Sequence, residues 1–578
     1  MRPIVDPRGG DIEDDASSTK SRTLISLAGS LLAEISFPKL VVAWTILIGL
    51  PVLVLGLAPF LASIWLQSLS AQAFTLFTGL GPPLILIVLG AIGWWGGRRL
   101  WRLIETNFWS LNALAVQPGY ALVRELLRHL AEKLMPAGTP QARRDLVRAL
   151  CAALAGLIVC VVSVALARLA WPYARWTGSL ADLGLPMHLV VVAICNSVVI
   201  ISAYVAVAAV TWGLADALMP QPRDLPTFAS GDDSARTWRV AHLSDIHIVG
   251  ERYGFRIESG RAGPRGNERL RRALATLERV HHERPIDVVL VSGDLTDAGR
   301  SSEWAEFFDI IAAHPALAAR MVAIPGNHDL NIVDRANPAR LDLPTSPYRR
   351  MRQLRALSAF ALLQGDRVRL VDAAKGIGPT LAEAVEAHRV QIADFADRGG
   401  FKLLRPLEDL WTSAFPMVLP PSEPGGLGLV LMNSNAEAHF SFTNALGLVS
   451  RDQTKAVERV LSDYPDAGWA LVLHHHVVEY PRAAKSLSER VGTALANGTW
   501  FIRRMRRLAG HAVILHGHRH VDWIGRCGDL QIVSAPSPVM DVTDTDDSYF
   551  YIQNFQVGPR GRIDLLAPDR IDVAGEAA

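Results

Sequence analysis

The chain has 578 residues, of which half are hydrophobic and a fifth are charged, and its formal net charge is +2 at pH 7. This length exceeds one ordinary domain. A charge so close to zero excludes the strongly basic class of nucleic-acid-binding proteins, so we expect no nucleic-acid partner. Of the cysteines only Cys527 lies outside the apolar stretches, which excludes a disulfide framework in the polar part of the chain.

Apolar residues are concentrated in the first part of the chain. Residues 40–97 contain no Asp, Glu, Lys, Arg or His, and one bilayer crossing takes about 20 residues. We therefore predict transmembrane helices at 40–66 and 76–97, and two more in the uncharged stretches 149–167 and 189–214. Buried helices of a soluble core are rarely so long and uncharged. Residues 40–218 are thus expected to form an all-α membrane region of four helices.

Basic residues in short connections stay on the cytoplasmic side of a membrane. Many Arg and Lys residues lie between the second and third predicted spans, none lie between the first two, and only Arg168 and Arg175 lie between the last two. This pattern places both termini in the cytoplasm and predicts a multi-pass protein of the inner membrane. Residues 1–39 are polar and too long for the start of a cleaved signal peptide, so the first span should remain as an anchor.

The loop after the second span contains ALVRELLRHLAEKL, residues 121–134. Apolar residues recur there at helical spacing and basic residues occupy the other side. Such a helix could lie on the anionic inner leaflet. The alternative is a plain helical hairpin that connects two spans.

Residues 219–236 are rich in Pro, Gly, Ser and Asp, which indicates a linker. After it come short apolar runs of strand length, and each run ends in polar residues. Ligands bind at the carboxyl ends of strands in open sheets, so polar side chains gathered there predict a site. They are Asp245, His247, Asp294, Asp297, Asn327, His328, Asn433, Asn435, His474, His475, His476, His516, His518 and His520.

Carboxylate, imidazole and amide ligands together suit divalent Mn, Fe or Zn. A carboxylate that bridges two such ions would help them lower the pKa of a shared water for attack on phosphorus. The lack of cysteine ligands argues against a closed structural zinc site. A His-x-His-x-His run alone would fit a solvated loop equally well, so the other strand ends decide the interpretation.

The series SDIH, GDLTD, GNHD, HHH and GHRH, in this order, resembles the calcineurin-like metallophosphoesterase superfamily, and within it the bacterial branch with cyclic-nucleotide and glycerophosphodiester phosphodiesterases. The resemblance covers roughly residues 238–557. It implies a metallo-dependent phosphatase-like fold of the α/β (α+β) class, a four-layer αββα sandwich of two mixed sheets at residues 237–570. This domain would follow the four transmembrane helices.

Two metal sites are implied by the resemblance. The first would be formed by Asp245, His247, Asp294 and His520. Asp294 would bridge to the second site, which is completed by Asn327, His474 and His518. His474 is preferred to His475 because it directly ends the strand, although His476 and Val477 stand where the family often has a proline.

His328 is implied to face the substrate rather than the metals. It would stabilise negative charge in the transition state or protonate the leaving alkoxide. A neighbouring acid should orient its ring. Asp297 matches the family position for this role, and Asp329 is the alternative.

A segment at about residues 331–425 has none of the motifs and is expected to be a helical cap beside the metals. Its first half is basic. A solvated helix face would explain most of these residues, and the alternative is that one or two bind an anionic part of the substrate. They are Arg335, Arg340, Arg349, Arg350, Arg352 and Arg355.

The sequence thus predicts a membrane-anchored phosphoesterase, most consistent with a phosphodiesterase, that uses two divalent metal ions and a metal-bridging hydroxide. Its phosphoester substrate would be a cyclic nucleotide or other small diester, or a lipid phosphoester in the bilayer. The alternative is a membrane sensor or transporter with an attached regulatory domain. Against transport, the predicted spans lack the ionisable residues that ion and substrate pathways usually carry.

Overall fold

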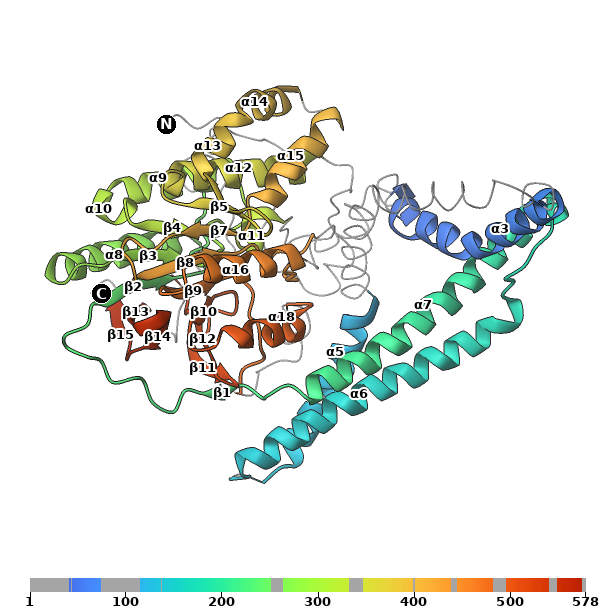
Figure 1. Cartoon of the computed structure of the whole chain (residues 1–578), viewed down its shortest axis with the longest axis horizontal. Helices are drawn as coiled ribbons and strands as arrows, with labels where there is room; N and C mark the ends of the chain where they lie inside the picture. The colour runs from blue at the N-terminus through green and yellow to red at the C-terminus, as the bar shows by residue number, and fades with distance from the viewer. Residues whose placement is uncertain are drawn as a thin grey trace. The chain divides into compact units, whose positions relative to one another are not determined.

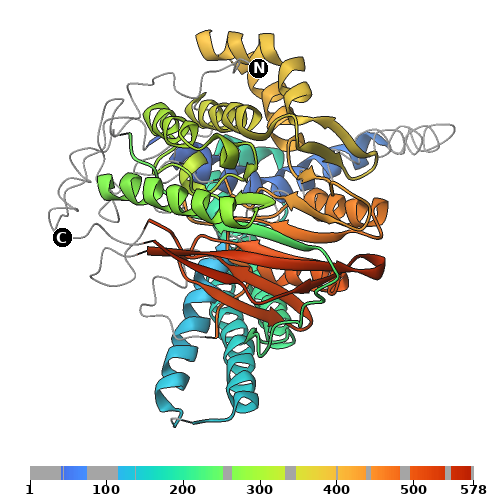
Figure 2. The same ribbon diagram turned by 90° about the vertical axis from the view of Figure 1, so that its left-hand side faces the viewer.

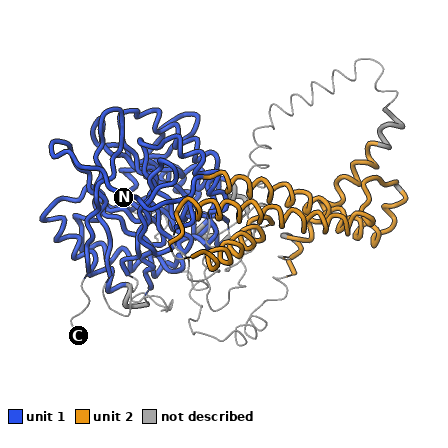
Figure 3. Tube along the Cα trace, turned by 90° about the horizontal axis from the view of Figure 1, so that it is seen from below, with its two compact units in different colours: residues 1–35, 220–485, 492–578 blue, residues 36–219, 486–491 orange. Residues whose placement is uncertain are grey.

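The computed structural model of the chain (Figure 1) describes residues 41–42, 44–73, 115–136, 138–250, 263–331, 347–398, 401–437, 444–481, 495–539 and 548–573. The chain divides into two compact units (Figure 3). A helical unit comprises Ser36–Met219 with Ser486–Val491, and the remainder forms a unit that contains the sheets. The predicted span at residues 76–97 and the N-terminal segment 1–39 lie outside the described residues.

Two helices of the helical unit are long and apolar enough to cross a membrane, and they contain the third and fourth predicted spans. The first predicted span corresponds to a shorter apolar helix, Leu50–Leu66. Length and composition therefore support two of the four predicted spans. The described helices are η2 (Thr45–Gly49), α3 (Leu50–Ala73), α5 (Gln117–Leu134), α6 (Gln141–Ala170), α7 (Pro186–Ala217) and the short turns η4 (Trp171–Tyr173) and η5 (Leu180–Gly184).

Small and polar residues join α7 to its neighbours. A Cβ atom on Gly156 of α6 would lie 2.5 Å from the carbonyl oxygen of Ala209, so glycine is needed for this close approach. The Asn196 side chain donates to the Gly56 carbonyl at 2.8 Å, and Ser197 donates to the Val52 carbonyl at 2.7 Å. The polar residues of the fourth predicted span therefore serve helix packing.

Three charged residues of α5 form ion pairs within the helical unit. Arg124 donates to Asp216 of α7 at 2.6 Å, and Arg128 pairs with the buried Glu125 at 2.9 Å. Leu122 and Leu126 are exposed on the other side. The expected basic surface of this helix is thus used to neutralise two carboxylates.

The two mixed sheets expected from the sequence are present. The larger has the strand order β1-β11-β12-β10-β9-β8-β7-β5-β6, and the smaller has β14-β13-β2-β3-β4 with β15 paired to β13. The larger consists of β1 (Arg223–Asp224), β5 (Arg369–Asp372), β6 (Gly376–Thr380), β7 (Met417–Leu419), β8 (Leu427–Leu431), β9 (Gly468–Val472), β10 (Ala512–His516), β11 (Trp523–Cys527) and β12 (Leu530–Ser534). The smaller consists of β2 (Thr237–Leu243), β3 (Val288–Val291), β4 (Met321–Ala323), β13 (Ser548–Gly558), β14 (Arg562–Leu565) and β15 (Asp569–Val573).

Each sheet has a parallel group of strands. In the smaller sheet β2, β3 and β4 run parallel, and in the larger sheet β8, β9, β10 and β12 do so. Strands β13 and β14 contact β8, β9 and β10, so the sheets pack face to face and share a core. The apolar runs read from the sequence before each polar cluster are these parallel strands.

Helices flank the sheets. Helix α8 contacts β15 (Figure 2), α12 contacts β4, and α16 contacts β5 and β6. The described helices of this unit are α8 (Gly263–Glu283), α9 (Ser301–Ala312), α10 (Pro315–Ala318), α11 (Asn327–Leu330), α12 (Pro347–Gln364), α13 (Leu381–Ala387), α14 (Arg389–Arg398), α15 (Phe401–Ser413), α16 (Arg451–Asp463) and α18 (Gly498–Met505), with turns η7 (Arg506–Leu508) and η8 (Pro559–Gly561).

The expected helical cap is only partly helical. Strands β5, β6 and β7 come from this segment and extend the larger sheet beyond β8. Helix α12 packs on β4, and its residues Leu354, Leu357 and Phe360 belong to the main core. Buried apolar residues on this helix make it part of the fold and not a separate lid.

The predicted linker is attached to the sheet unit over much of its length. Strand β1 pairs antiparallel with β11, and the Leu225 amide donates to the Ile524 carbonyl at 3.1 Å. The buried Trp523 donates from Nε1 to Asp224 at 2.8 Å. Backbone pairing with an edge strand thus orders a stretch whose composition is typical of a flexible connection.

We predict that Asp224→Ala destabilises the sheet unit by about 1 kcal/mol, because it removes the side-chain partner of a buried indole N–H. Urea unfolding of the full chain, followed by circular dichroism, measures the change. Asp233→Ala, at an exposed position in the same segment, should have no effect. Equal midpoints for the two variants would contradict a stabilising role for this contact.

Candidate metal centre

The parallel strands of both sheets direct the predicted ligands to one place. Strands β2, β3 and β4 of the smaller sheet precede Asp245, Asp294 and Asn327, and β9 and β10 of the larger sheet precede His474 and His518. All five side chains are buried or nearly so. The centre is therefore built between two sheets, with each sheet supplying part of it.

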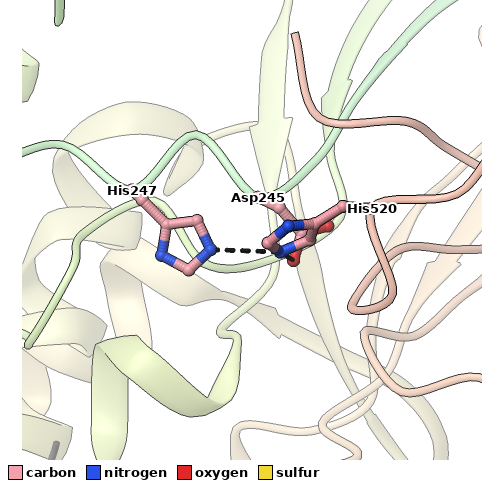
Figure 4. Close-up of side chains that lie close together, drawn as sticks. All are labelled: Asp245, His247 and His520. Atoms are coloured by element: carbon pink, nitrogen blue, oxygen red, sulfur yellow. Dashed lines mark hydrogen bonds and ion pairs between the residues drawn. The ribbon is translucent and has the colours of Figure 1, made fainter. Parts of the chain in front are cut away.

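The first group of ligands is Asp245, His247 and His520 (Figure 4), whose ligand atoms lie within 4.8 Å of one another. The Nε2 atom of His520 is 3.1 Å from Oδ1 of Asp245 and 3.3 Å from Nε2 of His247. Two imidazole nitrogens that face each other so closely need a proton or a cation between them. This group matches the predicted first metal site.

The second group is Asp294, His474 and His518, again within 4.8 Å. The Nε2 atom of His474 lies 3.3 Å from Oδ2 of Asp294, 3.1 Å from Nδ1 of His518 and 3.1 Å from Oδ1 of Asn327. Four potential ligand atoms thus converge near one point. This group matches the predicted second metal site.

Asp294 lies between the two groups. Its Oδ2 atom is 3.3 Å from His474 and 3.7 Å from Nε2 of His247. Its Oδ1 atom accepts a hydrogen bond from the His328 amide at 2.8 Å. The Asp294 carboxylate thus lies within reach of both groups, where the family resemblance implied a bridging ligand.

The backbone is strained at the ligands. Of the described residues other than glycine, six have positive φ, and five of these are predicted ligands. A left-handed conformation costs a residue with a Cβ atom about 1–2 kcal/mol, and such strain is typical of functional sites. The five are Asp245, His247, Asp294, His518 and His520, with φ of 55°, 42°, 51°, 73° and 52°.

The tautomer of His474 suits metal binding. Its Nδ1–H donates to the Ser292 carbonyl at 2.9 Å, which leaves Nε2 directed at Asp294 and His518. Burial alone would lower the pKa of His474, but Asp294 and Asp245 raise it to about 9. In the metal-free chain a proton therefore occupies the position that suits a cation.

The donor set fits a pair of divalent cations. Burial alone would raise the pKa of Asp294, yet His474 and His328 hold it well below its ordinary value. Burial would likewise raise the pKa of Asp245, but the neighbouring His520 holds that pKa below its ordinary value, which keeps Asp245 ionised. Two buried carboxylates with converging imidazole and amide ligands are suited to Mn, Fe or Zn.

His328 and Asp297 differ in part from the prediction. His328 donates from Nδ1 to the backbone carbonyl of Asp297 at 2.7 Å, so the main chain orients its ring. The Asp297 carboxylate is 3.9 Å from that nitrogen and 3.6 Å from Nδ1 of His247. The carboxylate thus lies nearer to a predicted metal ligand than to the residue it was expected to orient.

Asp329, the alternative for that role, binds backbone. It accepts from the amide and hydroxyl of Thr296 at 2.9 and 2.7 Å and from the Gly326 amide at 2.8 Å. Burial is the main reason that its pKa is raised to about 6. Asp329 therefore ties the loop after β3 to the loop after β4.

The remaining histidines make other contacts. His475 bonds through Nδ1 to the Ser434 hydroxyl at 2.9 Å, His242 bonds to Ser292 at 3.0 Å, and His516 bonds to the Gly517 carbonyl at 3.1 Å. Burial lowers the pKa of His242 and of His516 to about 3. These side chains are neutral groups that support the centre.

Sequence analysis missed the role of Ser434. Its Oγ accepts from the amides of His474 and His475 at 3.1 Å each, and so fixes the start of the loop after β9. The signal for it was its place between Asn433 and Asn435 at the end of β8. A serine in a loop is too common for that signal to stand out.

The basic residues of α12 are not a solvated face. Arg352 donates to the Leu330 carbonyl and Arg355 to the Gly299 carbonyl, both at 2.9 Å, and both side chains are buried. They hold the loops after β4 and β3. Arg349 pairs with the carboxylate of Glu437 at 3.2 Å, and Arg350 pairs with that of Glu408 at 3.6 Å. Arg335 and Arg340 lie outside the described residues.

The family comparison agrees with this geometry. Residues 239–522 match the family model described as calcineurin-like phosphoesterase. The chain therefore contains a calcineurin-like phosphoesterase domain, with the metallophosphatase-like α/β fold of two mixed sheets. The curated proteins include no match.

Several solved structures resemble the chain. One, described as a candidate 5′-nucleotidase from Staphylococcus aureus, is 11% identical with a TM-score of 0.30, covering 59% of this chain and 55% of its own. A phosphopantetheinyl hydrolase from Mycobacterium tuberculosis is 14% identical with a TM-score of 0.23, covering 52% and 90%. A purple acid phosphatase from yellow lupin is 13% identical with a TM-score of 0.27, covering 56% and 50%. This chain thus spans about half the length of the nucleotidase and of the purple acid phosphatase.

We predict that Gly326→Ala displaces Asp294, because the new Cβ atom would lie 2.1 Å from the amide nitrogen and Oδ1 of that residue. The variant should retain fewer metal ions per chain than the wild type after dialysis, measured by elemental analysis. Gly231→Ala is the control, since its Cβ atom would make an ordinary contact of 3.4 Å with Leu566. Equal metal content in both variants would contradict the shared position of Asp294.

The buried carboxyl group of Glu303 should make the stability of the fold depend on pH. Burial raises its pKa from 4.5 to about 8, and its Oε2 accepts from the amides of Ala298 and Arg300 at 2.9 and 3.1 Å. The folded chain therefore holds a proton that the unfolded chain releases between these pH values. Stability contributed by the neutral carboxyl is complete below pH 4.5 and is lost as the pH rises toward 8.

Glu303→Gln should remove this dependence while keeping an acceptor oxygen. Between pH 5 and 8 the free energy of unfolding of the wild type should fall by up to about 4 kcal/mol more than that of the variant, since a shift of one pKa unit corresponds to about 1.4 kcal/mol. Urea unfolding at the two pH values measures this difference. Glu386→Gln, at an exposed site on α13, should behave as the wild type, and parallel curves for all three proteins would contradict the prediction.

Proposed function

We propose that this protein is a membrane-anchored phosphoesterase that uses two divalent metal ions. The observation that carries the proposal is the position of Asp294, whose Oδ2 atom lies 3.3 Å from one histidine group and 3.7 Å from the other. A carboxylate shared in this way is the central ligand of two-metal hydrolytic sites. The calcineurin-like phosphoesterase domain supports metal-dependent hydrolysis of a phosphoester.

Seven residues would hold the ions. The first ion would be bound by Asp245, His247, Asp294 and His520, and the second by Asp294, Asn327, His474 and His518. When bound, the ions would activate a water and neutralise charge on the phosphoryl oxygens. The chain's own contribution is to keep these ligands converged in a buried place, where ionic interactions are weakly screened.

His328 would act on the substrate. Because its Nδ1–H donates to the Asp297 carbonyl, Nε2 is the nitrogen that can gain or lose a proton. In its protonated form Nε2 would hydrogen bond a phosphoryl oxygen or give its proton to the leaving alkoxide. The ring packs edge-on against His247 with centroids 4.6 Å apart, which places it beside the first metal site.

The substrate is proposed to be a phosphodiester or phosphomonoester presented at the inner face of a bacterial inner membrane. Helices α6 and α7 are long and apolar enough to form the anchor, and apolar side chains such as Leu157 and Val161 are exposed along α6. Basic residues between the second and third predicted spans favour a cytoplasmic position for the domain. Anchoring favours a lipid phosphoester over a soluble cyclic nucleotide, because the lipid lies in the same leaflet.

We predict that the full-length protein in detergent hydrolyses aryl phosphoesters when Mn²⁺ is added. Asp294→Asn should lower kcat on the order of 10³-fold or more, because both metal sites lose their shared charge. His328→Ala should lower kcat about 10²-fold or more, with the larger effect on poor leaving groups. Colorimetric release of the aryl alcohol measures both changes.

Asp572→Asn on the exposed strand β15 serves as the control carboxylate and should retain full activity. Hydrolysis that needs no metal, or that survives Asp294→Asn, would contradict the proposal. The same preparation, assayed with phospholipids in mixed micelles and with cyclic nucleotides, distinguishes the two substrate classes. Faster turnover of cyclic nucleotides would contradict the lipid assignment alone.

A further inference from the structure

Two loops that carry ligands of the second metal site meet at Glu479. His474 begins the loop after β9, and His518 lies in the loop after β10. The Glu479 carboxylate lies between these loops. Its Oε1 atom is 3.3 Å from Nε2 of His476, and its Oε2 atom accepts a hydrogen bond from Arg519 at 2.9 Å.

Both partners of Glu479 adjoin the predicted ligands. Arg519 stands between His518 and His520 in the chain. The His476 ring lies parallel to the His518 ring, with an interplanar angle of 14° and centroids 6.1 Å apart. The Glu479 carboxylate thus restrains the turn at residues 517–520 at two points. One is Arg519 within the turn, and the other is His476, whose ring lies beside that of His518.

Tyr480 adds a second attachment of the same turn. The guanidinium of Arg519 lies over the Tyr480 ring, 5.2 Å from its centroid. The Tyr480 hydroxyl bonds to Ser534 at 2.7 Å, and Ser534 donates to the Val521 carbonyl at 2.7 Å. Residues 479 and 480 therefore hold the turn at Arg519 and again at Val521.

This turn needs restraint from outside the metal ligands. His518 and His520 have φ of 73° and 52°, which is unfavourable for residues with a Cβ atom. The amides of His518 and Gly517 donate to the Asp245 carboxylate and to the His474 carbonyl, and both acceptor residues are themselves predicted ligands. Contacts through Glu479 and Tyr480 do not involve a predicted ligand, so they can hold the turn before any ion binds.

The ion pair is well placed to do this. The side chains of Arg519 and Glu479 are only 11% and 19% exposed, so solvent and salt screen the pair less than they screen a surface ion pair. The Glu479 carboxylate and the Tyr480 ring contact the planar guanidinium from different sides and so restrict its orientation. The arrangement fixes both the position and the orientation of Arg519.

We propose that Glu479 is a positioning residue that holds residues 517–520 ready for metal and thereby sets the affinity of the second site. This inference rests on the proposed function. Glu479 acts through its contacts with Arg519 and His476. Loss of its charge should weaken binding of the second ion more than binding of the first, because the His476 ring that Glu479 contacts lies beside His518.

Metal titration of the full-length protein in detergent tests this inference. Equilibrium dialysis with Zn²⁺ measures the number of ions bound and the affinity of each binding step, and the visible absorption of Co²⁺ reports the coordination of the ion bound in each step. Glu479→Gln should weaken the second binding step about 10- to 100-fold, the usual effect of losing an outer contact of a metal site. Activity should return toward the wild-type kcat at high metal concentration, because the catalytic groups are unchanged.

Glu458→Gln is the matched control. Glu458 forms a partly buried pair with Arg504 at 2.7 Å in the same unit, and it should leave both binding steps unchanged. Arg519→Lys keeps the positive charge and should weaken the second step by a smaller factor. The exchange of both charges, Glu479→Arg with Arg519→Glu, should restore part of the affinity, which loss of general stability would not do.

The outcomes separate the two proposals. If wild type and Glu479→Gln both bind two ions with equal affinity, the role of Glu479 is wrong and the proposed function stands. If Glu458→Gln weakens the second step as much as Glu479→Gln does, the effect is one of general stability and the inference is wrong. If the wild type binds no second ion, the two-metal function itself is wrong.

Discussion

Two carboxylates, Asp245 and Asp294, are buried in one place between two sheets, and the structure around them is arranged to compensate their charge. A buried anion is costly unless it is paired and hydrogen bonded. Imidazoles from the loops after β9 and β10 approach these carboxylates, and the Asp294 carboxylate also accepts a hydrogen bond from the His328 amide. Cations bound among these groups would complete the compensation of charge. The need to neutralise two buried carboxylates therefore accounts both for the side chains gathered at this place and for its suitability for metal ions.

The position of the centre between the sheets has a consequence for stability. The second ligand group takes Asp294 and Asn327 from the smaller sheet and His474 and His518 from the larger one. Neither sheet could hold this group alone. Bound ions would therefore join the two sheets, and their binding free energy would add to the stability of the fold. Strained ligand residues are tolerated because packing on both sides determines their conformation.

The helical unit follows the same rule in a different setting. Glu125 and Asp216 are buried, and each has an arginine partner within 2.9 Å. The exposed side chains of α6 and α7 are predominantly apolar. Charges are thus satisfied internally where the surface is suited to lipid. From α7 the chain continues directly into β1, which pairs with the strand that follows the His518 and His520 loop.

The parallel strands and the candidate ligands at their ends could be predicted from the amino-acid sequence alone. Continuous apolar runs, each followed by Asp, Asn or His, predicted the parallel strands and the polar side chains at their ends. This was possible because the hydrophobicity of a strand and the chemical type of a ligand are local properties of the sequence. It could not show that Asp297 orients His328 through its backbone carbonyl, since nothing in a residue's identity specifies which of its atoms is used.

The folded arrangement of the loops shows which side chains lie close enough together to share a cation. His474 and His475 are adjacent in the sequence, and the structure shows that His474 faces Asp294 whereas His475 faces Ser434. The arginines of α12 looked like a solvated face and proved to be buried against loop carbonyls. The linker looked flexible, and two of its residues proved to form a short edge strand on β11. These outcomes depend on contacts between residues far apart in the chain, and local composition carries no information about such contacts.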